Sequence, residues 1–266
     1  MVKREQFSIN AKMVLITGAS GGLGEQLAYE CAKQQAGLIL VARREEVLKQ
    51  VANKCQQWTN QPVYYYACDL SKATEVELLL EKIQSIDVDI VINNAGRGYL
   101  KQAVDLSKEE IEEMLQLNLY TLIQTTQHYL SKFIKKKSGM FVQIASQAGK
   151  TATPKTSVYS ASKFGVLGYS NALRLELKEQ GIHVMTVNPG PIATQFFEKA
   201  EPTGKYLASV SQYVLTSEEV AREIVRGMEL QKREVNVPYS MNLAAKLNFC
   251  FPKIGDFSIL KLFNKK

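Results

Sequence analysis

A tyrosine and a lysine stand four residues apart in the stretch "YSASKFGVLGYSNALRLEL", residues 159–177. The pattern is typical of a helix, on which positions four apart share a face, so Tyr159 and Lys163 can bring a phenol and an ammonium group together. The residues between them are small and leave room beside the pair. A phenol is a candidate proton donor, and a nearby cation favours its ionised form. The alternative is a surface tyrosine that packs against a lysine stem.

A glycine-rich segment, "TGASGGLGEQLA", follows the first short apolar run and has Gly18, Gly22 and Gly24 where a helix has to begin. Residues without Cβ let backbone N–H groups approach a pyrophosphate, whose charge a helix N-terminus stabilises. The spacing G-x-x-x-G-x-G differs from the commoner pattern G-x-G-x-x-G. A plain strand-to-helix turn is the alternative, but the position after the first strand favours a dinucleotide site.

Two arginines, Arg43 and Arg44, follow the second apolar run, nineteen and twenty residues after Gly24. An acidic residue there would bind a ribose 2′-hydroxyl, whereas a guanidinium suits a 2′-phosphate. The alternative is that both arginines are simply solvated before a helix. Positive charge is unfavourable at a helix N-terminus, although Glu45 and Glu46 partly offset it. The pair therefore favours NADP(H) over NAD(H), with Arg43 as the first phosphate partner and Arg44 as the second.

Seven short β-branched runs alternate with amphipathic stretches, which indicates parallel strands connected by helices. Several of the runs are continuously apolar instead of alternating, as a sheet covered by helices on both faces requires. The sequence therefore predicts an α/β fold with a doubly wound parallel sheet, in which ligands lie beyond the carboxyl ends of the strands. The predicted strands are 13–17, 38–42, 63–67, 89–93, 139–145, 183–188 and 234–238, and the main predicted helices are 23–35, 45–58, 72–85, 108–136, 157–180 and 217–230.

Polar or small residues follow the later strands at the same edge of the sheet. Asp69 comes after the third strand and either caps the next helix or binds an adenine amino group; Ser71 is the better cap, so we expect the adenine contact. The segment "NNAG", 93–96, follows the fourth strand and lies beside the cofactor unless it is a plain turn. Ser146 follows the fifth strand, and "NPGPIAT", 188–194, follows the sixth.

The composition bounds the class of protein. The chain has 266 residues, 45% of them hydrophobic, and no linker, repeat or low-complexity run, which favours one domain over residues 1–266. Four cysteines without a C-x-x-C pair, and two histidines far from them, predict no metal site and a reduced, cytoplasmic protein. The charged N-terminus and short apolar runs argue against export and membrane spanning. The net charge of +7 comes without an aromatic and basic groove motif, so we expect no nucleic-acid binding.

Taken in order, these motifs resemble the short-chain dehydrogenase/reductase family, in its compact single-domain branch. The match runs from about residue 11 to 195 through "TGASGGLG", "CDL", "NNAG", Asn118 inside "LNLYT", "IAS", "YSASK" and "NPGPIAT". The ordered set is far more specific than any one of its motifs. The resemblance implies a Rossmann-type seven-stranded sheet, a nicotinamide cofactor and a catalytic tetrad of Asn118, Ser146, Tyr159 and Lys163.

The resemblance also implies a role for each of these residues. Tyr159 would act as acid/base on a carbonyl oxygen, Ser146 would fix that oxygen, Lys163 would bind the nicotinamide ribose, and Asn118 would hold a water. Thr194 would reach the nicotinamide amide. The predicted cofactor site comprises Gly18, Ser20, Gly22, Leu23, Gly24, Arg43, Arg44, Asp69, Asn94, Ala95, Gly96, Tyr159, Lys163, Pro189, Gly190, Ile192 and Thr194.

The first functional hypothesis is an NADP(H)-dependent oxidoreductase with a small-molecule carbonyl or alcohol substrate. Its cofactor half would span about 11–145 and its catalytic and substrate half about 146–240. A non-catalytic NADP(H)-binding regulator is the alternative, but it would be expected to lack part of the Tyr, Lys and Ser set. A sugar-nucleotide epimerase would need a larger C-terminal domain than the residues after Thr194 provide. Phe196, Phe197, Tyr206 and Leu207 either form an apolar substrate pocket or cover the core.

The C-terminal tail, residues 241–266, has a composition that the catalytic core does not explain. Its apolar side chains alternate with five lysines and one aspartate. Pro252 and Gly255 are expected to break any long helix into two short amphipathic pieces. Either the apolar groups cover the substrate-side rim or a neighbouring subunit of the expected homodimer or homotetramer, or the tail lies peripherally at an anionic membrane surface.

Overall fold

Within residues 7–263, the part of the chain that the computed structural model describes, seven parallel strands form one sheet. The side chains of Lys205, Leu262 and Phe263 are outside that description, as are residues 1–6 and 264–266. The strands run in the order β3-β2-β1-β4-β5-β6-β7. Their bounds are β1 Met13–Thr17, β2 Gly37–Ala42, β3 Val63–Ala67, β4 Ile90–Asn93, β5 Gly139–Ile144, β6 Ile182–Pro189 and β7 Glu234–Val237. The predicted seven-stranded, doubly wound single-domain fold is confirmed.

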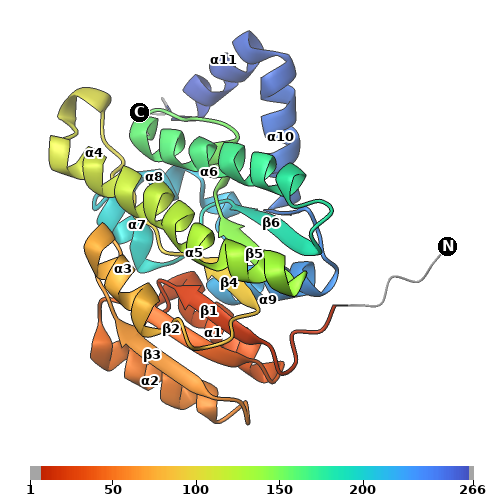
Figure 1. Cartoon of the computed structure of the whole chain (residues 1–266). Coiled ribbons are helices and arrows are strands. Elements are labelled where there is room, and N and C mark those ends of the chain that lie inside the picture. The colour runs from red at the N-terminus through yellow and green to blue at the C-terminus, as the bar shows by residue number, and fades with distance from the viewer. Residues whose placement is uncertain (1–6, 264–266) are drawn as a thin grey trace.

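Helices cover both faces of the sheet (Figure 1). One face carries α1 Gly22–Lys33, α2 Glu45–Gln56 and α9 Ser217–Glu229, and the other carries α3 Ala73–Lys82, α5 Thr121–Lys136 and α6 Ser157–Glu176. The remaining helices are α4 Lys108–Leu115, α7 Gln195–Ala200, α8 Lys205–Ser209, α10 Tyr239–Cys250 and α11 Pro252–Phe263, with short turns η1 Ala103–Asp105, η2 Gln116–Tyr120, η3 Gln147–Gly149 and η4 Ser211–Tyr213. None of the helices in residues 7–263 is long and apolar enough to cross a membrane.

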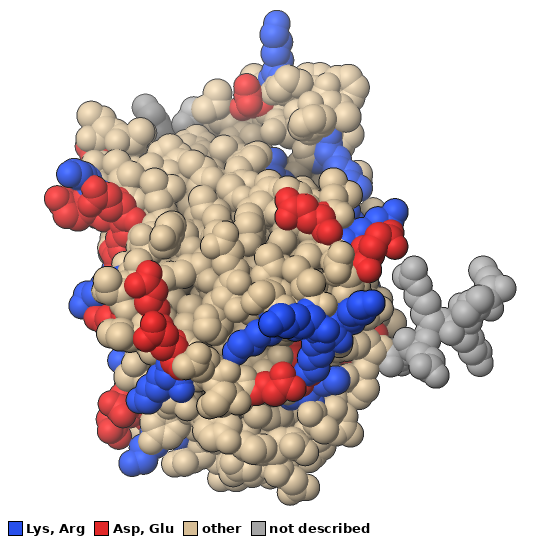
Figure 2. All heavy atoms as spheres, viewed as in Figure 1, with Lys and Arg blue, Asp and Glu red and all other residues tan. Residues whose placement is uncertain are grey.

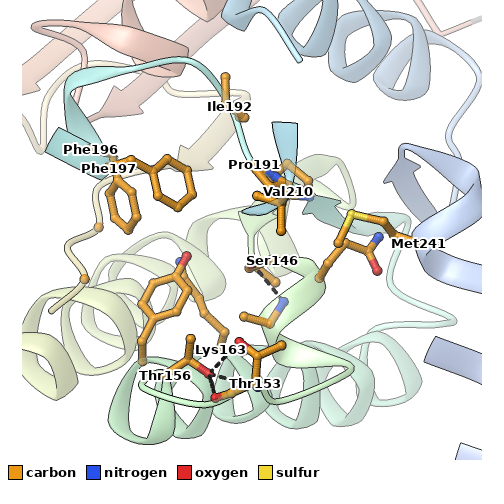
Figure 3. Close-up of a pocket in the computed structure, with 18 of the residues that line it drawn as sticks. Ser146, Thr153, Thr156, Lys163, Pro191, Ile192, Phe196, Phe197, Val210 and Met241 are labelled. Carbon is orange, nitrogen blue, oxygen red and sulfur yellow. Dashed lines mark hydrogen bonds between the residues drawn. The ribbon is translucent and has the colours of Figure 1, made fainter. Parts of the chain in front are cut away.

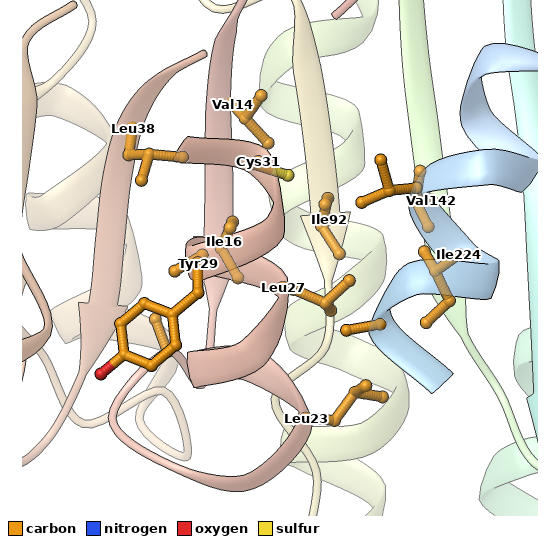
Figure 4. Close-up of a cluster of buried hydrophobic side chains, with 14 of the residues drawn as sticks. Val14, Ile16, Leu23, Leu27, Tyr29, Cys31, Leu38, Ile92, Val142 and Ile224 are labelled. Carbon is orange, nitrogen blue, oxygen red and sulfur yellow. The ribbon is translucent and has the colours of Figure 1, made fainter. Parts of the chain in front are cut away.

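Strand side chains alternate between two buried layers. Val14 and Ile16 of β1 pack in the cluster formed with α1 and α9, and Figure 4 shows Leu27 of α1 and Ile224 of α9 in the same cluster. Leu15, between them in the sequence, points to the other face and packs in the cluster formed with α3, α5 and α6. Because both faces are covered, most positions of the central strands are apolar, which explains the continuous runs in the sequence.

The strand order reverses between β1 and β4, whose following segments turn to opposite sides of the sheet. A reversal of this kind opens a crevice at the carboxyl edge of the strands, where ligands bind in open α/β sheets. The glycine-rich turn after β1 and the segment 94–96 after β4 meet at that point. This arrangement places the motifs from distant parts of the sequence in one location.

The helical stretch predicted over 108–136 is confirmed, but it is not a uniform α-helix. α4 begins with a capping box between Ser107 and Glu110, and a π-helical turn, Gln116–Tyr120, separates it from α5. A π turn inserts one extra residue into the helical ladder and is frequent at functional sites. Asn118, a predicted catalytic residue, lies inside this turn.

The tail forms two helices, as the sequence predicted, but only one of the two residues expected to separate them lies at the break. The helix break falls at Phe251, and Pro252 opens α11, where a missing N–H costs nothing. Gly255 does not break the helix but lies inside it. A Cβ at this glycine would clash with the Asn248 side chain, so glycine permits α11 to pack closely on α10.

Candidate active site

A cavity of about 770 Å³ opens at the carboxyl edge of the sheet, between the glycine-rich turn and the α10–α11 hairpin. Sixteen of the seventeen residues predicted for the cofactor site, and three of the four predicted for catalysis, line it. Asp69 and Asn118 are the exceptions. The lining includes Gly18, Ser20, Gly22, Leu23, Gly24, Arg43, Arg44, Asn94, Ala95, Gly96, Ser146, Tyr159, Lys163, Pro189, Gly190, Ile192 and Thr194.

The glycine-rich turn depends on residues without Cβ. Gly18 and Gly22 have φ angles of +71° and +55°, a left-handed conformation that other residues rarely adopt. A Cβ at Gly24 would clash with the Gly18 carbonyl. Asn94 fastens this turn to β4, because its Nδ2 donates to the Thr17 carbonyl at 2.9 Å and its N–H donates to Thr17 Oγ1 at 2.9 Å. The turn is therefore held rigidly against the end of the sheet.

The two arginines occupy different positions at the rim of the turn. Arg44 lies across it, and its guanidinium donates to the Ser20 carbonyl at 2.6 Å and to Ser20 Oγ at 3.4 Å. Arg43 lines the cavity close enough to Asp69 to act on its charge. Burial works to raise the pKa of Asp69, but hydrogen bonds from Ser71 and the charge of Arg43 outweigh it and hold that pKa below its usual value.

Asp69 was expected to contact adenine and Ser71 to cap the next helix, but the two residues hydrogen-bond to each other. The Asp69 carboxylate accepts from Ser71 N at 3.1 Å and from Ser71 Oγ at 2.7 Å. Lys72 is the N-cap of α3, without a side-chain cap bond, so the expectation that Ser71 caps this helix is wrong. The adenine contact of Asp69 stays a prediction.

The phenol of Tyr159 and the ammonium of Lys163 meet Ser146 at the centre of the cavity. Lys163 is 4% exposed, its Nζ donates to the Ile144 carbonyl at 2.8 Å, and it lies 5.9 Å from the centre of the Tyr159 ring. Ser146 follows β5 as the N-cap of η3, accepts from Ala148 N at 3.0 Å and hydrogen-bonds Tyr159. Figure 3 shows Ser146 and Lys163 at the floor of the cavity. The close grouping expected from the sequence is therefore present.

Burial controls the charge states of this pair. It raises the pKa of Tyr159 to about 12, although the hydrogen bond with Ser146 works in the opposite direction. It lowers the pKa of Lys163 to about 8. The sequence predicted that Lys163 would lower the pKa of Tyr159, but the net shift of that pKa is upward because burial dominates. Tyr159 keeps its proton at neutral pH, and Lys163 is close to its own titration.

The Asn118 side chain does not line the cavity but hydrogen-bonds to the loop after β4 and to α6. Its Oδ1 accepts from Arg97 N at 2.8 Å, and its Nδ2 donates to the Arg97 carbonyl at 2.8 Å and to Ser162 Oγ at 3.0 Å. The buried amide thus fixes the loop after β4 to the helix that carries Tyr159 and Lys163. Sequence reasoning missed this role, because a π turn leaves no local pattern by which to find it.

Apolar side chains from two directions line the outer part of the cavity. Phe196 packs on Tyr159 with ring centres 5.7 Å apart, and Phe197 stacks on Tyr206 at 5.5 Å. Phe196, Phe197 and Tyr206 line the cavity, which confirms the interpretation of the segment after Thr194 as a pocket wall. Leu207 does not line it. The opposite wall comes from α10 and α11, in agreement with the interpretation that the tail covers the substrate-side rim, and Figure 3 shows Met241 facing Phe196 and Phe197 across the cavity.

A lysine missed by the sequence analysis joins the turn after Ser146 to the C-terminal elements. Lys150 Nζ donates to Glu234 Oε2 at 2.7 Å, to Asn236 Oδ1 at 2.8 Å and to Asn242 Oδ1 at 2.9 Å. Glu234 and Asn236 belong to β7 and Asn242 to α10. Its partners are 84 to 92 residues away in the sequence, so no local spacing indicated them.

A doubly wound sheet that carries Ser, Tyr and Lys side chains beyond its strand ends, over a glycine-rich turn, defines a class of α/β enzymes. Residues 12–205 match the family described as short chain dehydrogenase. The match covers more than half of the chain, so the protein belongs to the short-chain dehydrogenase/reductase family of oxidoreductases, as the motifs indicated.

Similar proteins support the same assignment over nearly the whole chain. Ketoacyl reductase HetN of Nostoc sp. is 31% identical over 262 residues, which cover 96% of this chain and 89% of that protein. The 17-beta-hydroxysteroid dehydrogenase 13 of Mus musculus is 29% identical, with 91% and 79% covered. A short-chain dehydrogenase from Sphingobium yanoikuyae in complex with NADPH superposes with a TM-score of 0.81 at 26% identity, with 92% and 96% covered. An alcohol dehydrogenase from Thermococcus sibiricus complexed with 5-hydroxy-NADP has a TM-score of 0.75 at 27% identity, with 85% and 95% covered.

The family implies a nicotinamide dinucleotide, and the residues of this site fit one. The glycine turn forms a cradle that side chains would fill: a Cβ at Gly22 would lie 3.1 Å from Thr194 Cγ2. Gly21 is the N-cap of α1, so the N-terminal end of this helix, which carries partial positive charge, lies at the turn. A Cβ at Gly96 would lie 3.3 Å from Asn118 Oδ1, so glycine lets the loop after β4 lie close to Asn118.

Proposed function

We propose that this protein is an NADP(H)-dependent reductase of apolar ketones or aldehydes, or the corresponding alcohol dehydrogenase, with Tyr159 as the acid/base. The observation that carries the proposal is the grouping of Ser146, Tyr159 and Lys163 between a dinucleotide cradle and two apolar walls. The bound cofactor would supply or accept the hydride. The chain's own residues then have to hold the carbonyl and move one proton.

The charge states favour Tyr159 as the proton donor in reduction. With a pKa of about 12, the phenol is protonated at neutral pH and has a proton to give to the oxygen that becomes an alkoxide. Ser146, which hydrogen-bonds the same phenol, would hold the carbonyl oxygen in place. Lys163, when charged, would stabilise the phenolate that the transfer leaves behind. Asn118 would keep Tyr159 and Lys163 in position by fixing the loop after β4 to α6.

The preference for NADP(H) is assigned to Arg43 first and Arg44 second. Arg44 already donates to Ser20, whereas no hydrogen bond within residues 7–263 engages the guanidinium of Arg43. A guanidinium pairs with a phosphate through two parallel hydrogen bonds, and the same charge has no partner on a 2′-hydroxyl. The NADPH and 5-hydroxy-NADP complexes of the two similar structures support the assignment.

The apolar substrate is inferred from the cavity walls. Phe196, Phe197 and Tyr206 form one wall, and Met241, Leu247 and other residues of α10 and α11 form the opposite one. Burial of apolar area against such walls favours a bulky carbonyl compound over a small polar one. Relatives named for ketoacyl and hydroxysteroid substrates are consistent with this class.

The test is carbonyl reduction by the variant Tyr159→Phe, with NADPH and a panel of bulky ketones and aldehydes. Removal of the hydroxyl deletes the proton donor but keeps the ring, so turnover should fall by about 100- to 10,000-fold. NADPH affinity, measured by fluorescence titration, should stay near the wild-type value. Near-wild-type turnover in the variant would reject Tyr159 as the acid, and a wild-type protein that binds NADPH but reduces nothing on the panel would favour the non-catalytic alternative.

A further inference from the structure

The α10–α11 hairpin, residues 239–263, is poorly covered by the rest of the described chain. Asn242 and Ala245 are the buried residues of α10, and none of the described side chains of α11 is buried. The hairpin projects from the body in Figure 1, and Figure 2 shows a mainly uncharged surface over it. Seven of its large apolar side chains are 49% to 88% exposed: Leu243, Leu247, Phe249, Phe251, Ile254, Phe257 and Leu260.

α11 has two faces with different surroundings. Ile254, Ser258 and Ile259 line the cavity. Lys253, Phe257 and Leu260 follow one another at intervals of four and three residues, so they share a second face, which does not line the cavity. The outward face therefore combines exposed apolar groups with a lysine, and it has no function in the site described above.

The charges of the hairpin are almost all positive. Lys246, Lys253 and Lys261 are exposed, and Asp256 is the one acidic residue of the segment 239–263. A second copy of the chain seated on this face would bring like charges together and bury lysines, which interface cores avoid. An anionic lipid surface accepts both groups, because lysine stems run along apolar surface while their ammonium groups reach the headgroups.

We propose that the α10–α11 hairpin docks on an anionic membrane surface. Phe249 and Phe257 would enter the acyl boundary, and the three lysines would lie at the headgroups. Through Leu247, Phe251 and Ile254 the same hairpin forms a wall of the cavity, so docking brings that wall to the bilayer. A lipophilic carbonyl substrate would then enter from the acyl region. This last step rests on the proposed function, but the docking itself does not.

The test is co-sedimentation of the full chain with vesicles of phosphatidylcholine, with and without phosphatidylglycerol. The wild type should sediment with the anionic vesicles, less so as salt is raised, and weakly with the neutral ones. Lys253→Gln with Lys261→Gln should weaken binding by about 25-fold, since each lysine near an anionic surface contributes about 1 kcal/mol. Phe249→Ser with Phe257→Ser should weaken it at least about tenfold. Leu78→Ser on α3 (66% exposed) and Lys108→Gln on α4 are matched controls that should bind like the wild type.

The outcomes separate docking from catalysis. The four substituted hairpin residues do not line the cavity, so both double variants should keep wild-type NADPH affinity and turnover of a water-soluble ketone without vesicles. Absence of sedimentation with anionic vesicles at low salt overturns the proposal, as does equal binding to neutral vesicles. A change in the sedimentation-velocity mass of the variants without lipid would assign the hairpin to a second copy and also overturn it. Vesicle binding by a protein with no reductase activity would support docking while rejecting the proposed function.

Discussion

Tyr159 and Lys163 lie one turn apart on α6, yet burial moves their pKa values in opposite directions. Burial always disfavours the charged form, which is the phenolate of tyrosine but the ammonium of lysine. The tyrosine thus holds its proton more firmly than a free phenol, while the lysine gives its proton up more readily than a free amine. Of these two residues, Lys163 is therefore the one whose charge changes with pH near neutrality.

Carbonyl reduction should therefore decline as pH rises through about 8. The lowered pKa means that the ammonium form of Lys163 is present below that pH and is lost above it, so kcat/KM should fall towards tenfold per pH unit. The measurement is kcat/KM for one ketone at saturating NADPH, across about pH 6 to 10. Lys163→Arg, whose guanidinium stays charged, should lose this alkaline limb even if its overall rate is lower. A flat wild-type profile through this range would contradict the assignment.

Two short elements position the residues proposed for catalysis. The π turn Gln116–Tyr120 brings Asn118 to the backbone of Arg97, and η3 carries the chain from Ser146 to Lys150. Gly149 packs on the backbone of Lys163, where a Cβ would lie 2.8 Å from its carbonyl oxygen. At the other end of η3, Lys150 fastens the turn to β7 and α10. The element as a whole is thus fixed from both sides.

Lys150→Met should lower the free energy of unfolding by about 1–3 kcal/mol, because three hydrogen bonds are lost and the Glu234 carboxylate loses its cation. Urea denaturation at neutral pH measures the loss. Lys108→Met is the control: its side chain is 80% exposed and its partner Glu112 lies 3.6 Å away, so we expect less than about 0.5 kcal/mol.

The effect of Lys150→Met should shrink in acid. Burial works to raise the pKa of Glu234, but Lys150 outweighs it and the net shift is downward. A lowered carboxyl pKa stabilises the fold at neutral pH, and this contribution disappears as pH falls through the lowered pKa. Urea curves of wild type and variant at decreasing pH should therefore converge. A difference that persists unchanged in acid would mean that packing, and not the ion pair, accounts for the loss.

At the scale of the whole molecule, the cavity joins parts of the chain from Gly18 to Ile259. The glycine turn follows β1, the residues proposed for catalysis come from the turn after β5 and from α6, and the outer wall includes the last two helices. A ligand that spans this cavity contacts elements on both sides of the reversal between β1 and β4. Its binding free energy should therefore appear as stability of the entire domain.

NADPH at 100 times its dissociation constant should stabilise the folded protein by about 2.7 kcal/mol and raise Tm, whereas NADH at the same concentration should do so less. Differential scanning fluorimetry with each cofactor measures both shifts. Arg43→Asp should remove most of the difference between them, because it replaces the 2′-phosphate partner with a like charge. Lys49→Asp, an exposed change of the same kind on α2, should leave the difference intact. Equal shifts by NADPH and NADH in the wild type would reject the NADP(H) preference.

Local chemistry in the sequence determined the order of the elements and most of the site. Strands covered on both faces must be apolar throughout, a turn at a phosphate must lack Cβ, and residues four apart on a helix share a face. These are short-range requirements. For that reason Gly18, Gly24, Tyr159 and Lys163 could be assigned positions before any tertiary contact was known.

Only the tertiary structure decided how distant groups meet. Asn118 bonds to Ser162 across 44 residues and Lys150 to Glu234 across 84, and no periodicity in the sequence encodes such separations. Gly255 looked like a helix breaker, but it is the contact that lets α11 pack on Asn248. Burial, which raises the pKa of Tyr159 against the expected effect of its lysine, is likewise a property of the whole fold. Desolvation depends on every element that excludes water from a site, so a short stretch of sequence does not contain it.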